Sequence, residues 1–237
     1  MTTYILDTET TGLVEPHMTE AAYSIIDIVN GQVQVLQAPR SKRFNPLKPI
    51  SLGSMATSHI CDEDVANEPP HTEFRLPTNV EYLVGHNIDY DMQVLRNAGV
   101  THTPKLICTK AMSSYLLPTL ESHKLVSLLY HFHRQVAREQ AKHAHAAIYD
   151  IYFTQLVLSS LIELANSQSH NITNVASLYE FSEMARIPTH LSFGKYKGQA
   201  IKELATSSDG AGYLKWLLTQ DSIDPYLAEA CNQALQA

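Results

Sequence analysis

The sequence predicts an α/β protein in which helices pack on a mixed sheet, followed by a small C-terminal domain. Apolar, β-branched stretches come first, and short strands then alternate with helical segments, which is typical of a mixed sheet covered by helices. A polar segment at residues 167–174 precedes a compact segment rich in basic and aromatic residues. We therefore expect a first domain over residues 1–166, a linker region over 167–190 and a small C-terminal domain over 191–237.

The N-terminal part predicts an antiparallel meander of three strands. Residues 4–6 form an apolar run, and an apolar, β-branched stretch covers residues 20–29. Asn30 and Gly31 separate this stretch from residues 33–36, and an Asn-Gly pair between two such stretches is a strong hairpin signal. The first strand should therefore continue through a turn into a β-hairpin.

The rest of the first domain alternates between helix and strand patterns. Apolar residues at helical spacing indicate the helices, and short apolar runs bounded by polar or turn-forming residues indicate the strands. We expect a basic loop over residues 39–49, short helices over 54–59 and 62–65, strands over 81–84 and 105–108, and helices ending near 98, before 118, near 133 and near 165.

Composition places the chain among soluble globular proteins, with 44% hydrophobic and 17% charged residues. Its three cysteines are scattered and odd in number, which argues against a disulfide framework and suits a reducing cytoplasm. No secretory signal pattern is visible at the N-terminus. Polar residues interrupt the apolar stretch at 148–164, so we expect no membrane span.

The formal net charge of -7 argues against a protein that coats nucleic acid by bulk positive charge. It does not argue against a nuclease, because acidic residues that hold metal ions count as negative in this sum. The ions themselves then supply the positive field.

Acidic residues occur in three segments of the predicted first domain. Asp7 and Glu9 follow the first strand and share one face of it, because successive strand residues point to opposite faces. Asp91 lies at the start of a predicted helix, and Asp150 lies within a later one, five residues after His145. Four such carboxylates can hold two divalent ions of the Mg²⁺ type, and a histidine at the rim can accept a proton from attacking water.

Three motifs carry a resemblance to a known family. Asp-Thr-Glu-Thr-Thr-Gly at residues 7–12, Gly-His-Asn-x-x-Tyr-Asp at 85–91 and His-x-x-x-x-Asp at 145–150 resemble the exonuclease motifs of the DEDDh 3′–5′ exonucleases, the DnaQ-like group with an RNase H-like fold. The resemblance spans about residues 1–165. In one bacterial branch of the family it extends to the aromatic and basic tail, which other members usually lack.

The resemblance implies a function and a set of roles. The chain would remove nucleotides from the 3′ ends of single-stranded or duplex DNA as nucleoside 5′-monophosphates. Its expected role is DNA repair. We expect no association with a membrane, and the resemblance names no protein partner. Two Mg²⁺ or Mn²⁺ ions would be bound by Asp7, Glu9, Asp91 and Asp150, with His145 as general base. The residues implied to contact the substrate are Thr8, Thr10, Thr11, Gly12, Leu13, His59, His86 and Asn87.

The assignment of His145 makes a structural demand. Five residues along a helix turn a side chain about 140° away, whereas seven residues return it to nearly the same face. On a continuous helix His143 would share a face with Asp150, so His145 should lie on a loop or in a first turn.

Other functions remain open at the level of sequence. A ribonuclease of the same fold would use nearly the same chemistry, because only contacts at the 2′ position separate RNA from DNA. A non-catalytic nucleic-acid-binding or protein-binding module would have no need for mutually repelling carboxylates. In the tail, the aromatic residues Phe193, Tyr196, Tyr213 and Trp216 suit either a small core or, with the neighbouring lysines, a nucleic-acid surface.

Overall fold

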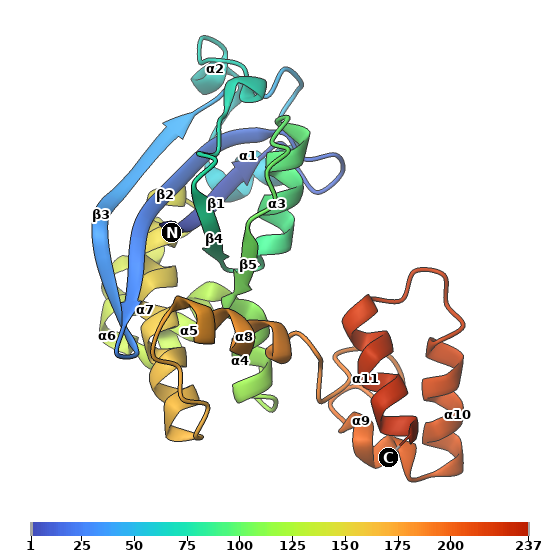
Figure 1. The fold of residues 1–237 in the computed structure, drawn as a ribbon. Helices are drawn as coiled ribbons and strands as arrows, with labels where there is room; N and C mark the ends of the chain where they lie inside the picture. Colours follow the sequence, from blue (N-terminus) through green and yellow to red (C-terminus); the bar gives the residue numbers. More distant parts are fainter. Residues whose placement is uncertain (1, 237) are drawn as a thin grey trace.

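A five-stranded sheet flanked by helices and a separate group of C-terminal helices make up the computed structural model, which describes residues 2–236 (Figure 1). The strand order is β3-β2-β1-β4-β5; β1 runs antiparallel to β2 and parallel to β4, which confirms the predicted mixed sheet. The strands are β1 Thr2–Thr10, β2 Met18–Val29, β3 Gln32–Arg43, β4 Val80–Gly85 and β5 Lys105–Cys108.

The predicted hairpin joins β2 and β3 through Asn30 and Gly31, both of which have positive φ angles, as the tight turn of such a hairpin requires. The loop predicted over residues 39–49 is wrong in its first part. Strand β3 continues to Arg43, which pairs with Glu20 of β2. The backbone hydrogen bonds between β2 and β3 hold this basic segment as a strand, and they do not depend on its side chains.

The other regular elements of residues 2–236 are helices. They are α1 Leu52–Ser58, α2 Asp62–Val65, η1 His71–Glu73, α3 Ile88–Asn97, α4 Thr109–Leu116, α5 Leu125–Phe132, α6 Arg134–Gln140, η2 Ala141–His143, α7 Ala147–Ser167, α8 Val175–Ala185, α9 Ile201–Ala205, α10 Ser208–Leu217 and α11 Pro225–Gln236. The expected helices correspond to α1 to α5 and α7, whereas α6, α8, α9 and α11 were not predicted.

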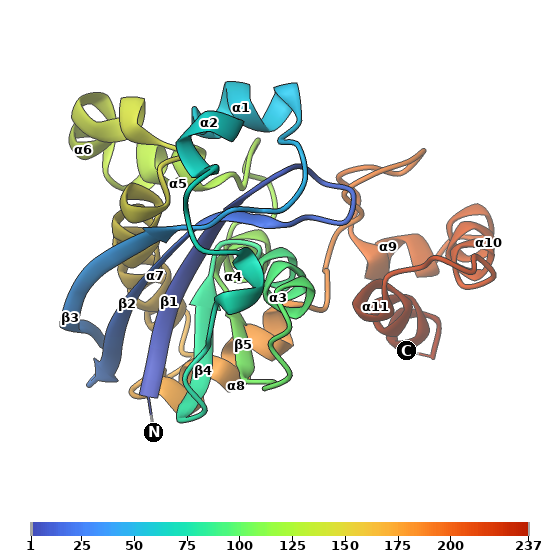
Figure 2. The same cartoon turned by 90° about the horizontal axis from the view of Figure 1, so that it is seen from above.

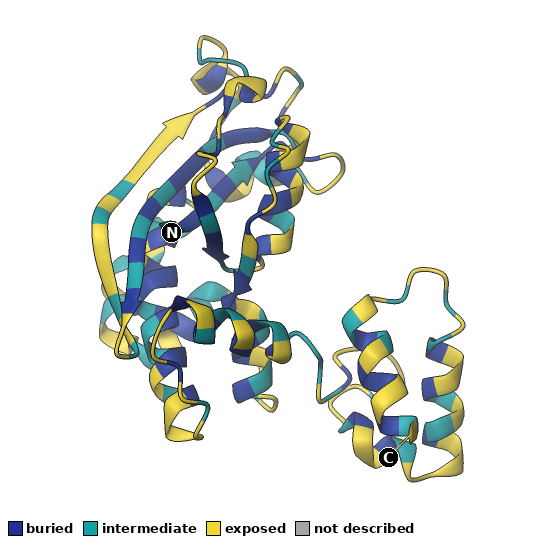
Figure 3. Ribbon diagram, in the orientation of Figure 1, coloured by how far each residue is buried: buried dark blue, intermediate teal, exposed yellow. Residues whose placement is uncertain are grey.

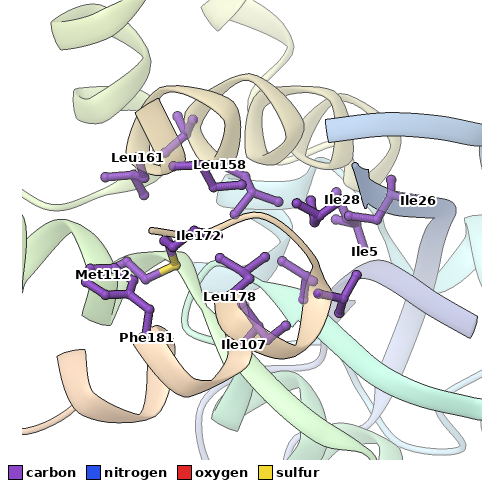
Figure 4. Packing of buried hydrophobic residues seen from close by; sticks show 14 of the residues in the cluster. Ile5, Ile26, Ile28, Ile107, Met112, Leu158, Leu161, Ile172, Leu178 and Phe181 are labelled. Carbon is purple, nitrogen blue, oxygen red and sulfur yellow. The ribbon is translucent and has the colours of Figure 1, made fainter. Parts of the chain in front are cut away.

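Alternation along β1 sends its side chains to two different cores. Ile5 faces the larger core, where helices α4, α5, α7 and α8 cover the sheet (Figure 4). Leu6 faces the other core, together with Leu95 of α3. Strand β1 is thus covered on both faces, and its C-terminal end is held between α3 and α7.

Helix α7 is the one described helix long and apolar enough to cross a membrane. Half of its most apolar 18-residue window is buried inside the protein, however, and Ile151, Leu158 and Leu161 pack in the larger core. Its apolar character is therefore that of a core helix, in agreement with the prediction that this segment does not span a membrane.

The predicted linker over residues 167–190 is wrong for most of its length. Helix α8 lies within it, and Leu178 and Phe181 pack in the larger core beside Ile172 (Figure 4). Residues 167–174 are polar, as a linker would be, but they form a short loop that is held in place. The side chain of Asn166 donates to the Ile172 carbonyl and accepts from the Ile172 N–H. The chain leaves the first domain only after α8.

Helices α9, α10 and α11 form the small C-terminal domain, which stands beside the sheet domain in Figures 1 and 2. Aliphatic residues make its core, including Ile201, Leu204, Leu214 and Leu227. The domain therefore folds around apolar residues of its own, and much of its outer surface is exposed (Figure 3).

Arg186 links the two domains. Its guanidinium lies 2.6 Å from an Oδ2 atom of Asp89 at the start of α3, and 2.9 Å from Glu183. The same guanidinium stacks over the ring of Tyr226 in α11, 5.4 Å from the ring centre. Only 6% of the Arg186 side chain is exposed, so it fixes the first turn of α11 against the end of α8.

The position of α8 can be tested by mutation. Leu178 is fully buried, so Leu178→Ala should lower the free energy of unfolding by about 2–5 kcal/mol through lost burial and a new cavity. Met184 lies on the same helix and is 38% exposed, so Met184→Ala should change stability little. Equal and small effects in urea unfolding would show that α8 is a linker segment after all.

Candidate active site

The end of β1 presents two carboxylates toward α7. Asp7 and Glu9 alternate with Thr8 and Thr10, which are buried on the opposite face of the strand. Glu9 lies opposite Glu20 in the β1–β2 ladder. Glu20 therefore adds a fifth acidic group beside the site, which could be recognised only from the register of the β1–β2 pair.

Asp91 reaches the same end of the sheet from the first turn of α3. Its side chain is buried, and Oδ1 accepts hydrogen bonds from the Thr8 backbone N–H at 3.0 Å and from the Thr8 hydroxyl at 2.7 Å. The threonine between the two acids of β1 thus fixes the third acid. This contact joins two motifs 83 residues apart.

Asp150 completes the group from the first turn of α7. Its Oδ2 atom accepts a hydrogen bond from the backbone N–H of His145 at 3.1 Å. Its Oδ1 atom is buried and has no hydrogen-bond partner. A buried carboxylate oxygen without a donor is costly unless a cation satisfies it, so this atom fits a metal ligand.

His145 lies outside α7, as its spacing from Asp150 requires. The helix begins at Ala147, and His145 has a φ of 66°, in the left-handed region that side chains rarely adopt. Glu9, His145 and Asp150 each offer one possible ligand atom, and these three atoms lie within 4.8 Å of one another. His143 instead stacks on Tyr149, with ring centres 4.4 Å apart, so the structure favours His145 as the histidine of the site.

The carboxylates raise one another's pKa. Burial and the charges of Asp91, Asp150 and Glu9 raise the pKa of Asp7 well above its ordinary value. Burial, together with the charge of Asp150, raises the pKa of Glu9 to about 9. All these effects disfavour the charged forms, and a nearby cation would reverse them.

The other two carboxylates are also shifted upward. Burial raises the pKa of Asp91 to about 7, although the hydrogen bonds from Thr8 oppose this. Burial raises the pKa of Asp150 to about 7, against the hydrogen bond from His145. For His145, burial and the charges of His59 and Lys124 lower the pKa, which keeps the imidazole neutral and able to accept a proton near pH 7.

The segment after Glu9 is held in place by Tyr90. Its hydroxyl lies 2.6 Å from the Thr10 hydroxyl and donates to the Gly12 carbonyl at 2.9 Å. The backbone N–H of Ser51 donates to the Thr11 carbonyl, which ties the same segment to α1. The Tyr90 hydroxyl thus binds the turn that follows Glu9.

Three apolar side chains project from this region, namely those of Leu13, Val14 and Leu52. Leu13 and Leu52 are 85% and 84% exposed, although both are large and apolar. Leu13 follows the turn at Gly12, and Leu52 is the first residue of α1. His59, at the C-terminal end of α1, is exposed and close enough to His145 for its charge to lower that residue's pKa.

Two further candidates bind α4. The Nδ1 atom of His86 lies 3.0 Å from the Thr109 hydroxyl, and burial lowers the pKa of His86 to about 4. The side-chain oxygen of Asn87 accepts a hydrogen bond from Lys110 at 3.3 Å. Polar atoms of both residues are thus already used within the protein.

Asp89, the additional acid in the second motif, pairs with Arg186. Its partner lies 97 residues away in the sequence, so no local pattern could have identified the pair. This ion pair accounts for the charge of Asp89 within the protein.

Comparison with known proteins identifies the family of this chain. The family model described as "Exonuclease" matches residues 4–158, which include all four carboxylates and His145. The chain belongs to the exonuclease family. This confirms the family predicted from the three motifs.

Individual relatives extend the comparison. The chain is 29% identical to "Exodeoxyribonuclease 10" of Escherichia coli K12 over 94% of both chains. It is also similar to the solved structure "Exonuclease X in complex with 5' overhanging duplex DNA", with a TM-score of 0.54 and 25% identity over 76% of this chain and 99% of that one. The chain also shares its fold with a structure of E. coli exonuclease I in complex with a dT13 oligonucleotide. The TM-score is 0.53 and the identity is 16%, and the match covers 71% of this chain and 42% of that one.

The raised pKa values predict how stability depends on pH in EDTA. Unfolding returns the carboxyl pKa values to about 4, so between pH 4 and 9 the folded protein binds more protons than the unfolded one. Stability should therefore fall by about 2 kcal/mol or more from pH 5 to pH 8. In Glu9→Gln the fall should be smaller, and a wild-type protein equally stable at both values would contradict the assigned burial.

Proposed function

We propose that the protein is a 3′–5′ exodeoxyribonuclease that hydrolyses the terminal phosphodiester of DNA and releases nucleoside 5′-monophosphates. The observation that carries the proposal is that Glu9 and Asp150 come together with His145, that the charges of Asp91, Asp150 and Glu9 act on Asp7, and that one buried Asp150 oxygen has no donor. Exonuclease family membership supplies the reaction class, and the names of the relatives support DNA as substrate.

We propose that Asp7, Glu9, Asp91 and Asp150 hold two Mg²⁺ or Mn²⁺ ions. Carboxylate oxygens are the ligands that such ions prefer, and the mutual repulsion of these side chains is relieved by positive charge. When bound, two ions stabilise both the attacking and the leaving oxygen of a phosphodiester displacement. In the protein, Thr8 holds Asp91 and the His145 backbone holds Asp150 for this purpose.

His145 acts as the general base in this proposal. Its ring is exposed at the rim of the carboxylate group and neutral near pH 7, so its free ring nitrogen can take the proton of an attacking water. The left-handed backbone at His145 turns the chain out of α7 and directs the ring toward Glu9 and Asp150.

The segment from Thr8 to Leu13 would contact the terminal nucleotide, and His59, whose charge acts on His145, would contact the substrate as well. Tyr90 keeps this segment in place through Thr10 and Gly12, and the exposed Leu13 offers an apolar surface to a base. His86 and Asn87 would act by positioning the start of α3 against α4 rather than through free polar atoms.

We also propose that the first domain, ending at α8, carries the chemistry, and that the protein works in cytoplasmic DNA repair.

The general base can be tested with two neighbouring histidines. His145→Ala should lower kcat by about two to four orders of magnitude, the usual contribution of a positioned base, while Mn²⁺ still stabilises the fold. His143→Ala serves as the matched control and should stay close to wild type, because His143 stacks on Tyr149 outside the carboxylate group. The reverse pattern would assign the role to His143.

The polarity of the reaction provides the test of the proposed function. A blocked 3′ end should prevent degradation of single-stranded DNA in Mg²⁺, whereas a blocked 5′ end should not, and chromatography should identify the products as nucleoside 5′-monophosphates. Asp150→Asn should abolish the activity. Degradation from the 5′ end, or faster turnover of matched RNA, would overturn the proposal.

A further inference from the structure

Exposed aromatic rings mark one surface of the C-terminal domain. Trp216 and Phe193 are 52% and 47% exposed, although aliphatic residues already form the core of this domain. Packing therefore accounts for Tyr196 and Tyr213, which lie partly against that core, but leaves the other two rings unexplained. Aromatic side chains on a soluble surface commonly serve recognition.

The rings form a continuous row. The Tyr196 and Tyr213 ring centres lie 5.0 Å apart, and those of Tyr213 and Trp216 lie 5.4 Å apart with an angle of 34° between the planes. Tyr213 and Trp216 share a face of α10 because they are three residues apart. We name the row of Tyr196, Tyr213 and Trp216 the aromatic strip.

A rigid turn holds the strip together. Gly194 and Gly198 adopt positive φ angles of 73° and 83°, and the N–H of Gly198 donates to the Leu191 carbonyl at 2.7 Å. A side chain at Gly194 would collide with the Tyr213 hydroxyl, so the turn lies directly on the strip. The arrangement is thus preorganised and loses little freedom on binding.

Positive charge accompanies the strip. Lys195 lies over the Tyr196 ring, with Nζ 4.8 Å from its centre, and the exposed Lys197 comes from the same turn. Lys215 is exposed next to Trp216, and Asp209 is the acid whose charge acts on Lys195. Exposed rings alternating with lysines can stack bases and contact phosphates at the same time.

A cavity connects this surface with the first domain. Its volume is about 370 Å³, and its lining includes Asn87 and Lys110 from the first domain and Phe193 and His190 from the C-terminal side. Asn87 belongs to the same motif as Asp91. The cavity therefore lies between the second motif and Phe193, where the two domains meet.

We propose that the aromatic strip, with Phe193, Lys195 and Lys197, is a second binding site that takes single-stranded DNA. Bases of the strand stack on Trp216 and Phe193, and its phosphates contact the two lysines. The choice of DNA rests on the proposed function, whereas binding at the strip does not require the carboxylates or a metal.

Trp216 provides the measurement, because it is the single tryptophan of the chain. A base stacked on its ring should quench its fluorescence when the full-length protein is titrated with oligothymidylate in EDTA, where no hydrolysis occurs. Lys195→Ala combined with Lys197→Ala should weaken binding about 10-fold and flatten its salt dependence. Lys105→Ala, at the start of β5, is the matched control and should bind as wild type does.

A second variant tests the stacking itself. Trp216→Ala should weaken binding of a dye-labelled oligothymidylate, followed by anisotropy, about 5- to 100-fold. Because Trp216 is exposed, the melting temperature of the Trp216→Ala variant should stay near that of the wild type, which excludes misfolding as the cause of weaker binding.

The proposal is overturned if oligothymidylate leaves the fluorescence unchanged, if the lysine variants bind normally, or if RNA or a blunt duplex binds more tightly than single-stranded DNA. These outcomes are separate from failure of the proposed function, which would appear as a lack of hydrolysis from 3′ ends in Mg²⁺ while binding in EDTA persists.

Discussion

The half-buried Asp7 and Glu9 at the end of β1 repel the buried Asp91 and Asp150, and the surrounding structure has to offset this repulsion. Burial and the neighbouring charges raise the pKa of Asp7. Burial and the charges of Asp150 and Glu20 raise the pKa of Glu9 as well. A fold that brings these groups together in a shielded place must hold them by other means. The sheet, packed on both faces at β1, supplies this support through its two cores.

Specific hydrogen bonds then set each acid in place. Thr8 binds Asp91 through both its backbone N–H and its hydroxyl, and the backbone of His145 binds Asp150. The left-handed conformation of His145 serves two ends, because it lets that backbone N–H face Asp150 and keeps the ring outside the helix. The strain at this residue accordingly lies within the proposed catalytic machinery, where such strain is often found.

Most of the sheet and the family were predictable from the sequence, because β1, the Asn30-Gly31 turn and the three motifs carry local signals. The position of His145 outside α7 followed from the family resemblance, which selects His145, combined with helical geometry, which by itself favours His143. Helix α8 was missed because its polar flanks resemble a linker, and its apolar residues are matched only by distant partners in the larger core. The pairs Asp89–Arg186 and Glu9–Glu20 depend on tertiary contact and strand register, which no local pattern reveals.

The most direct test of the account compares thermal unfolding of the wild type and Asp150→Asn in EDTA and in Mn²⁺. In EDTA the variant should be at least as stable as the wild type, because one repelling charge is removed. In Mn²⁺ at about 100 times its Kd the wild type should gain about 2.7 kcal/mol and the variant far less, so that the order reverses. A variant that is less stable in EDTA, or that gains as much from Mn²⁺ as the wild type, would contradict the central role of carboxylate repulsion.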